Sequence, residues 1–326
     1  MGHTKQPAVL FATALALAAA AFLLSLSVGR YPITWTGLWD DPYTARVFFT
    51  LRLPRACMAL SAGFALGVAG SVYQCVFQNP LASPDIIGVA SGASAGAAMA
   101  VLLFGGGVAV TALWAFAGGF LAVLAALALS ALSSRRGIAN LVLSGIVVNA
   151  LAQSVLMLMK LAADPEKELA SIEFWTMGSF ADITLSKLMG TLPWILLGLA
   201  GLFALRRQIV LLGLDEDDAQ MLGVPVKYMR PAILMLATLA TGAVISVTGL
   251  IAFIGLLAPH IARLLTRNGR FSTAVLAGLC GGILMLLSDV LARSIGDSEV
   301  PISIITSMLG APFLFWLMCG KEDLHG

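Results

Sequence analysis

The sequence LRLPR, residues 51–55, stands directly before the apolar run Ala56–Phe77. The run is long enough for an α-helix that crosses a bilayer, which takes about 20 apolar residues. Arg52 and Arg55 therefore lie at the mouth of a predicted membrane helix. Their role depends on the side of the membrane that they face and on what they meet there.

The composition is that of a membrane protein. Of the 326 residues, 59% are hydrophobic and 11% are charged, whereas soluble domains have roughly 25% charged residues. A net charge of +2 gives no basic surface for nucleic acid. All four cysteines lie in apolar runs without a CxxC pair or a neighbouring histidine, so we expect no disulfide framework, metal site or cofactor. They are Cys57, Cys75, Cys280 and Cys319.

Ten apolar segments, bounded by charged residues, glycine or proline, follow one another along the chain. The first could be a cleaved signal peptide, but it is long enough to span a bilayer and we predict a retained helix. No long polar domain interrupts the series. We therefore predict an all-α polytopic membrane protein of about ten transmembrane helices, with residues 1–326 as one domain. The segments are 8–28, 56–77, 86–104, 108–132, 138–160, 188–205, 232–251, 253–265, 271–295 and 302–319.

The distribution of basic residues indicates an orientation. With both ends of ten spans in the cytoplasm, eleven Lys and Arg residues fall on the cytoplasmic side and eight on the outer side. This excess agrees with the rule that cytoplasmic loops are rich in Lys and Arg. Arg52, Arg55 and Arg293 fall on the outer side, against that rule. We expect an external partner to account for them.

Glycines recur every four residues in several segments, as in Gly88, Gly92 and Gly96. Gly63 and Gly67, and Gly278 and Gly282, have the same spacing. Residues four apart share one helix face, so these glycines allow helix backbones to approach closely. The pattern predicts a tightly packed bundle and says nothing of activity.

The sequence contains an internal repeat. A shift of 175 residues places residues 55–86 over residues 230–261 without a gap, and nine of the 32 positions match. The matches include Arg55 with Arg230 and Pro84 with Pro259. In the predicted topology the two arginines lie on opposite sides, which makes the repeat inverted. Inverted repeats underlie alternating access in many transporters.

No enzyme motif is present in the sequence. It has no GxxxxGK[ST] phosphate loop, no HExxH and no GxSxG. We therefore do not expect an enzyme, and any ATP used by this protein must be bound by another chain.

The loop formed by residues 206–230 is the most informative part of the predicted cytoplasmic side. Asp215–Asp218 would favour a helix N-terminus, Gly223 would end that helix, and Pro225 follows directly. This pattern predicts a short helix, a sharp turn and a second short helix that enters the membrane at Arg230. The alternative is an ordinary solvated loop.

Five motifs in order between Leu51 and Leu317 together resemble the FecCD family. They are LRLPR, NPLASPDIIGVASGASAG, LGLDEDDAQMLGVPV, GLIAFIGLLAPHIARLL and LGAPFLFWL. The family consists of permease subunits of prokaryotic ABC importers for iron–siderophore complexes, haem and vitamin B12. The resemblance implies ten helices per subunit, a homodimer around a central pathway in the cytoplasmic membrane, two ATPase subunits and an external substrate-binding protein.

The resemblance also implies a role for the outer arginines. In the vitamin B12 permease of the family, the LRLPR arginines pair with glutamates of the binding protein. The matching residues here are Arg52 and Arg55, and Arg293 matches a third docking arginine. Guanidinium groups bind carboxylates through two parallel hydrogen bonds, and charges at the rim of an interface set docking rate and register. The alternative is that the arginines only anchor helix ends at the lipid headgroups.

The resemblance implies two further sites. The acidic loop resembles the family's coupling helices, which lie in a cleft of the ATPase; the residues concerned are Asp215, Glu216, Asp217, Asp218, Ala219 and Gly223. Asn79 and Leu81 match one segment of the cytoplasmic gate. The opposite segment, SSRRGIANL, is shorter than in the vitamin B12 permease and lacks its Thr–Ser pair, and we assign Asn140 to it.

A secondary transporter driven by an ion gradient is the main alternative, and it would need ionisable groups near the membrane centre. Asp289 is the strongest carboxylate candidate inside a span, but Arg293 lies one turn away, so we expect a local ion pair. Asp85 and His260 lie at predicted helix breaks, and for His260 we expect a structural hydrogen bond.

The substrate is indicated by fewer residues than the importer class is. The presumed pathway around the fifth and tenth segments carries few charges, so selectivity would belong to the binding protein. PDIIGVASG and FWTMGSF resemble ferric-siderophore permeases, which favours an iron chelate. Haem, cobalamin and molybdate, which relatives in the family transport, are the alternatives.

Overall fold

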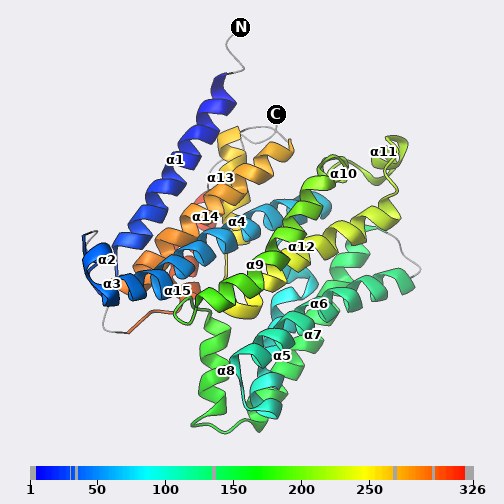
Figure 1. The fold of residues 1–326 in the computed structure, drawn as a ribbon. Coiled ribbons are helices and arrows are strands. Elements are labelled where there is room, and N and C mark those ends of the chain that lie inside the picture. The colour runs from blue at the N-terminus through cyan, green and yellow to red at the C-terminus, as the bar shows by residue number, and fades with distance from the viewer. Residues whose placement is uncertain are drawn as a thin grey trace.

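The computed structural model describes residues 5–29, 31–33, 36–133, 137–266, 270–295 and 298–319, and within these ranges it contains helices and no strand. Figure 1 shows the start of α1 and the α10–α11 segment toward the top, α2 and α3 at the left, and α8 toward the bottom. The elements are α1 (Lys5–Ser27), α2 (Gly37–Asp40), α3 (Pro42–Val47), the π-helix η1 (Phe48–Arg52), α4 (Leu53–Val76), the 3₁₀-helix η2 (Pro84–Ile87), α5 (Val89–Phe104), α6 (Val108–Leu132), α7 (Ile138–Ala162), α8 (Glu168–Met177), α9 (Leu185–Ala204), α10 (Arg206–Leu211), α11 (Glu216–Met221), α12 (Val226–Thr248), α13 (Ile254–Thr266), α14 (Phe271–Ser294) and α15 (Ile302–Cys319).

The helices confirm the predicted series of ten apolar segments. Seven helices of the described residues are long and apolar enough to cross a membrane. Three shorter apolar helices, Val89–Phe104, Ile254–Thr266 and Ile302–Trp316, complete the series. The fold class is therefore the one that the sequence predicts.

The prediction for the start of the second span was wrong. That span is helical from Pro42 to Val76, so LRLPR lies inside the helical path and not before it. Pro54 is tolerated because it stands in the first turn of α4, and the π-helical turn of η1 leads the chain into it.

The centre of the fold is α4, which packs against α14, α12 and α13. Glycines make the α4–α14 contact close: a Cβ atom on Gly63 would lie 2.2 Å from the backbone oxygen of Gly281. A Cβ atom on Gly67 would lie 2.2 Å from the oxygen of Ala277. The glycine spacing in the sequence therefore has the packing role that we predicted.

The backbone supports the predicted repeat. Gln78 (φ +48°) and Phe253 (φ +66°) are the non-glycine residues with positive φ among the described residues, and they are 175 positions apart. Such residues are uncommon. Each follows one of the two repeated helices, α4 and α12, which run in opposite directions in Figure 1.

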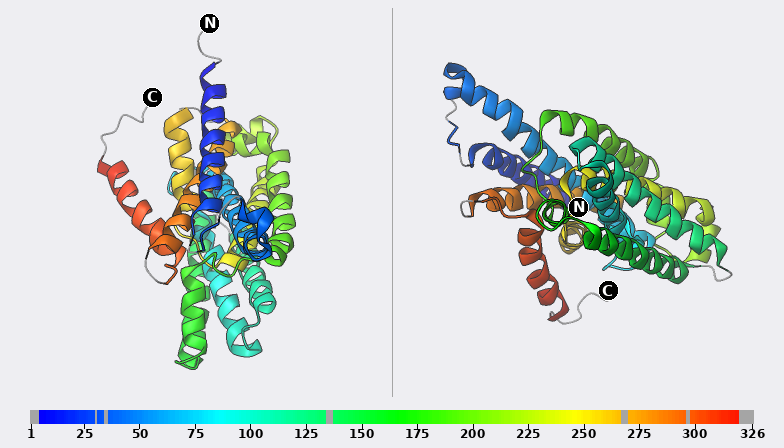
Figure 2. Two further views of the ribbon diagram at one scale, coloured as in Figure 1. Left: turned by 60° about the vertical axis from the view of Figure 1, so that its left-hand side comes forward. Right: turned by 90° about the horizontal axis from the view of Figure 1, so that it is seen from below.

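The last helix, α15, lies at the edge of the molecule. Figure 2 shows it standing out from the other helices, with contacts to α13 and α14 near its start. The ring of Phe253 packs against its Gly310, where a Cβ atom would lie 2.5 Å from the ring. Its far side exposes Met308, Phe315 and Trp316 at 69%, 70% and 61%.

Candidate functional site

Arg55 is the centre of a charge cluster at the end of the molecule opposite α11. Its two terminal nitrogens donate to the two carboxylate oxygens of Glu299, each at 2.9 Å. Its Nε donates to Asp289 at 3.0 Å, and one terminal nitrogen lies 2.9 Å from the same carboxylate. Asp289 is fully buried and also lies 3.5 Å from Nε of Arg293. The predicted pairing of Asp289 with Arg293 therefore exists, but Arg55 is the closer partner.

Arg52 and Arg293 are buried and bonded inside the fold, each 6% exposed. Arg52 donates to the backbone oxygens of Leu26 and Ser27 at 2.9 and 3.0 Å and to that of Tyr31. Arg293 donates to the backbone and hydroxyl oxygens of Ser25 at 2.7 and 2.9 Å. Both side chains thus hold the end of α1 against the bundle, a role that the sequence did not reveal.

The connection that follows α1 is held by a helix cap. Asp41 accepts from the backbone N–H groups of Tyr43 and Thr44 at 3.1 and 3.0 Å, and from the Thr44 hydroxyl. The Thr44 hydroxyl and these two backbone groups lower the pKa of the Asp41 carboxyl, because they stabilise its charged form. The cap fixes the start of α3, next to the helical turn that carries Arg52.

The acidic loop forms the short helix that the sequence predicts, α11, after Asp215. Glu216, Asp217 and Asp218 make its first turn. Gly223 ends it with φ +84°, and the Gly223 and Val224 N–H groups donate to the oxygens of Gln220 and Ala219 at 2.9 and 3.0 Å. This is the Schellman arrangement, in which glycine is favoured at the left-handed position.

The predicted second short helix does not exist as a separate element. It forms the first turns of α12, which runs without interruption through Pro231. Arg230 lies in these turns and pairs with Glu216 of α11 at 3.1 Å, which fixes α11 against α12. A second difference is α10, a short helix between α9 and α11 that the sequence did not predict as a separate element.

The surface of α11 combines charge with exposed apolar side chains. Asp217 and Asp218 are exposed, and Ala219 is buried against the fold. Met221 and Leu222 are 86% and 55% exposed. A small projecting helix with this mixture is suited to insertion into a cleft of another chain.

The predicted gate residues lie on two separate segments. In the turn after α4, Asn79 accepts from the Leu81 N–H at 2.9 Å, and Leu81 is 55% exposed. Asn140, at the start of α7, donates to the Ser130 backbone and hydroxyl oxygens at 2.9 and 3.1 Å. In the part of the chain that the structure describes, no hydrogen bond joins Asn140 to the turn. Residues 134–136 of the same segment lie outside the described residues.

Gln78 links this turn to the acidic loop, which the sequence gave no means of predicting. Its side-chain amide donates to the backbone oxygen of Leu214. The Cys75 thiol, one turn earlier in α4, donates to the oxygen of Ile209 at 3.0 Å. The end of α4 is thus bonded to both sides of the α10–α11 connection.

The predicted helix break at His260 was wrong, because His260 lies inside α13, which continues through Pro259. Its side chain is hydrogen-bonded inside the fold, as we expected. It is 7% exposed, and its Nδ1 lies 3.1 Å from one terminal nitrogen of Arg263. The other terminal nitrogen of Arg263 donates to the side-chain oxygen of Gln74. The described residues contain no group of three or more His, Cys, Asp or Glu side chains that could hold a metal ion.

Comparisons with known proteins agree over nearly the whole chain. The model of the FecCD transport family matches residues 17–320. The chain is 35% identical to the molybdate import system permease MolB of Haemophilus influenzae, over 100% of this chain and 99% of that protein. It is 32% identical to the hemin transport system permease HmuU of Yersinia pestis, over 99% of each chain.

A solved structure has the same fold. It is an inward-facing conformation of a metal-chelate type ABC transporter, with a TM-score of 0.88 and 35% identity. The match covers 97% of this chain and 100% of that one. Sequence motifs, helix order and known structures thus agree, and the chain belongs to the FecCD transport family.

Proposed function

We propose that this chain is the membrane-spanning permease subunit of a binding-protein-dependent ABC importer that carries an iron chelate inward. The observation that carries the proposal is the match to the FecCD family over residues 17–320, in a chain of ten apolar helices. The ATP is hydrolysed by a separate subunit, and this chain acts as a transport subunit and not as an enzyme.

Two ATPase subunits, one per copy of this chain, are the proposed partners at α11. The support is the exposed acidic and apolar surface of α11, held by the Arg230–Glu216 pair. This side then faces the cytoplasm of a bacterium or archaeon, and both chain ends lie on it. The terminal residues 1–4 and 320–326 themselves are outside the described residues.

A second copy of this chain is the proposed partner of α7 and α15. Both helices expose large apolar side chains, among them Leu151 and Met157 of α7 at 61% and 65%. A pathway between two such faces would present few charges to the passing substrate. Selection of the substrate would then fall to the extracytoplasmic binding protein.

The iron chelate is favoured over other substrates by the FWTMGSF and PDIIGVASG segments, which resemble ferric-siderophore permeases. Haem is a second candidate, because a hemin permease is 32% identical over nearly the full chain. Molybdate is a third candidate, because a molybdate permease is 35% identical over the full chain. The substrate can be assigned by uptake into proteoliposomes that contain this chain, its ATPase, ATP and the binding protein. Ferric siderophore, haem, cobalamin and molybdate would be offered separately.

We expect uptake of the iron chelate, and we expect this uptake to require the ATPase, ATP and the binding protein together. Uptake of only haem, molybdate or cobalamin would keep the importer assignment and replace the proposed substrate. Uptake without the ATPase, driven by an imposed ion gradient, would contradict the importer itself. The secondary-transporter alternative is disfavoured by Asp289, because its carboxylate is buried and paired with two arginines of the same chain.

The cluster around Arg55 is the proposed docking site for the binding protein. Arg52 and Arg293 would stabilise this site from inside the fold, because their side chains are already hydrogen-bonded to backbone oxygens at the end of α1. The guanidinium group of Arg55 forms a two-fold salt bridge with Glu299, whose side chain is 27% exposed. A carboxylate of the binding protein would therefore replace Glu299 as the salt-bridge partner of Arg55.

This exchange predicts that Glu299→Gln tightens docking several-fold, because it weakens the internal competitor for Arg55. Arg55→Gln should weaken docking by about tenfold or more. The affinity of the immobilised importer for its binding protein would be measured at physiological salt. Arg46→Gln, an exposed cation on the neighbouring α3, is the control and should have little effect. Weaker docking in Glu299→Gln would contradict the exchange.

The α11 helix is the proposed coupling element. Gly223→Val should uncouple ATP hydrolysis from uptake, because a β-branched residue is strongly disfavoured at φ +84° and α11 would lose its end. Both rates would be measured in proteoliposomes with loaded binding protein. Gly105→Val is the matched control: it has φ +73° and, like Gly223, open space around a Cβ atom, but lies in the α5–α6 turn. Normal stimulated uptake in Gly223→Val would contradict the coupling role.

We propose further that Gln78 transmits movement of the α10–α11 connection to the gate turn with Asn79 and Leu81. The support is the bond from Gln78 to the Leu214 oxygen, together with the bond from Cys75 to Ile209. Asn140 is the proposed gate residue on the opposing segment. A displaced α11 would then move the end of α4 directly.

A further inference from the structure

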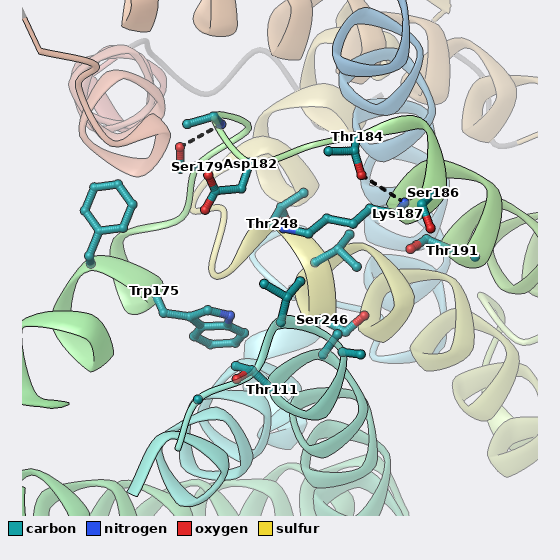
Figure 3. A pocket seen from close by; sticks show the side chains of 18 of the residues that line it. Thr111, Trp175, Ser179, Asp182, Thr184, Ser186, Lys187, Thr191, Ser246 and Thr248 are labelled. Atoms are coloured by element: carbon teal, nitrogen blue, oxygen red, sulfur yellow. Dashed lines mark hydrogen bonds between the residues drawn. The ribbon is translucent and has the colours of Figure 1, made fainter. Parts of the chain in front are cut away.

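A large open cavity lies between the outer ends of α6 and α9, apart from the docking, coupling and gate residues. Its volume is about 1020 Å³. The first turns of α6 and α9 form its two sides, and Ser246–Thr248 of α12 form its back. The end of α8 and the connection to α9 cover it from outside (Figure 3).

The cavity is open, and exposed residues of both α6 and α9 line it, among them Val108 and Gly190. Both helices pack against α12, and Phe116 of α6 meets Trp194 of α9 with ring centroids 6.2 Å apart. Leu51, Val108 and Phe174 line the cavity and are 49%, 60% and 48% exposed, so its rim is apolar. In a bilayer this rim faces the acyl chains of the outer leaflet.

The inner surface of the cavity carries groups that attract an oxyanion. Lys187 extends into it in Figure 3, and the described residues contain no ion pair of Lys187 within 4.0 Å. Thr111 is 7% exposed, lines the cavity, and its hydroxyl has no hydrogen-bond partner among the described residues. The N-termini of α6 and α9, at Val108 and Leu185, also lie at the cavity and add the positive ends of two helix dipoles.

Other lining residues suit an amphiphilic molecule. Trp175 lines the cavity, and tryptophan is favoured at the level of lipid headgroups. Asp182, an exposed carboxylate at the cover, is a counter-charge that would limit the binding of a free multivalent anion. A buried oxyanion site with an apolar rim matches a phosphate group that carries acyl chains.

We propose that this cavity binds the phosphate of an outer-leaflet phospholipid. Lys187, the Thr111 hydroxyl and the two helix N-termini hold the phosphate, and the acyl chains leave past Val108 at the apolar rim of the cavity. A free oxyanion shares this chemistry, and the test separates the two sources. The proposal is independent of the transported substrate, because the measurement involves no uptake.

The test uses the complex of full-length chain and ATPase, stripped of lipid in detergent and titrated with phosphatidylglycerol in native mass spectra. Lys187→Gln should raise the lipid concentration for half-occupancy of the first site per subunit about tenfold. Lys167→Gln, which changes an outer lysine that does not line the cavity, should stay within about twofold. Gly190→Phe should also weaken binding, because nothing lies within 4 Å of a Cβ atom there and the ring would occupy the cavity.

Several outcomes would overturn the proposal. Equal binding in the Lys187→Gln and Lys167→Gln variants would remove the site. Binding of inorganic phosphate or molybdate that depends on Lys187 and displaces the lipid would replace the phospholipid with a free oxyanion. If Lys187→Gln does not assemble, retention of lipid by Gly190→Phe would equally contradict the assignment.

Discussion

Asp289→Ala is expected to lower the stability of the permease by about 3–5 kcal/mol. Asp289 is fully buried and faces two cations, Arg55 at 2.9 Å and Arg293 at 3.5 Å. Removal of the carboxylate leaves Arg293 buried without its ion-pair partner, and among the described residues Ser25 then accepts its hydrogen bonds. An unfolding titration of the purified complex with sodium dodecyl sulfate would measure the loss.

The control for this change is an exposed ion pair. Glu173 pairs with Lys160 at 2.9 Å, and their side chains are 44% and 28% exposed. Glu173→Ala should cost about 1 kcal/mol or less, because water replaces the lost partner. Similar losses in both variants would show that Asp289 is not the buried centre of the cluster. Combining Arg55→Met with Asp289→Leu should recover part of the stability, since it removes both charges of the closest pair.

The sequence predicted the elements that depend on local patterns. The ten apolar segments are the apolar helices of the structure, because about 20 apolar residues in a row have few alternatives to a membrane helix. Gly223 ends α11 as predicted, because the left-handed position needs a residue without a Cβ atom. The repeat was detectable because the spacing from Arg55 to Pro84 equals the spacing from Arg230 to Pro259.

Contacts between distant residues could not be predicted from these patterns. The Arg55–Glu299 pair joins residues 244 positions apart, and nothing local marks Glu299 as a partner. Gln78 would be expected to continue a helix or a turn in an ordinary conformation, yet its φ is +48°. The bond of Gln78 to the Leu214 oxygen, formed by the fold, is the contact that accompanies this conformation.

A substitution at the contact between α4 and α14 is expected to have the second large effect on stability. Gly67→Ala should destabilise the permease by about 1–3 kcal/mol, because the new methyl group would lie 2.2 Å from the backbone oxygen of Ala277. The two helices would have to separate, which also disturbs the neighbouring Gly63–Gly281 contact. The same unfolding titration would measure the change.

The repeat itself supplies the control for this prediction. Gly242 is the residue 175 positions after Gly67, and a Cβ atom there would lie 3.7 Å from Phe116, an ordinary contact. Gly242→Ala should therefore be neutral or stabilise by about 0.5–1 kcal/mol, because alanine loses less backbone entropy in a helix. This entropy gain is common to both variants, so the difference between them isolates the packing of α4 on α14. Equal changes in both would mean that these helices do not approach as closely as the glycines allow.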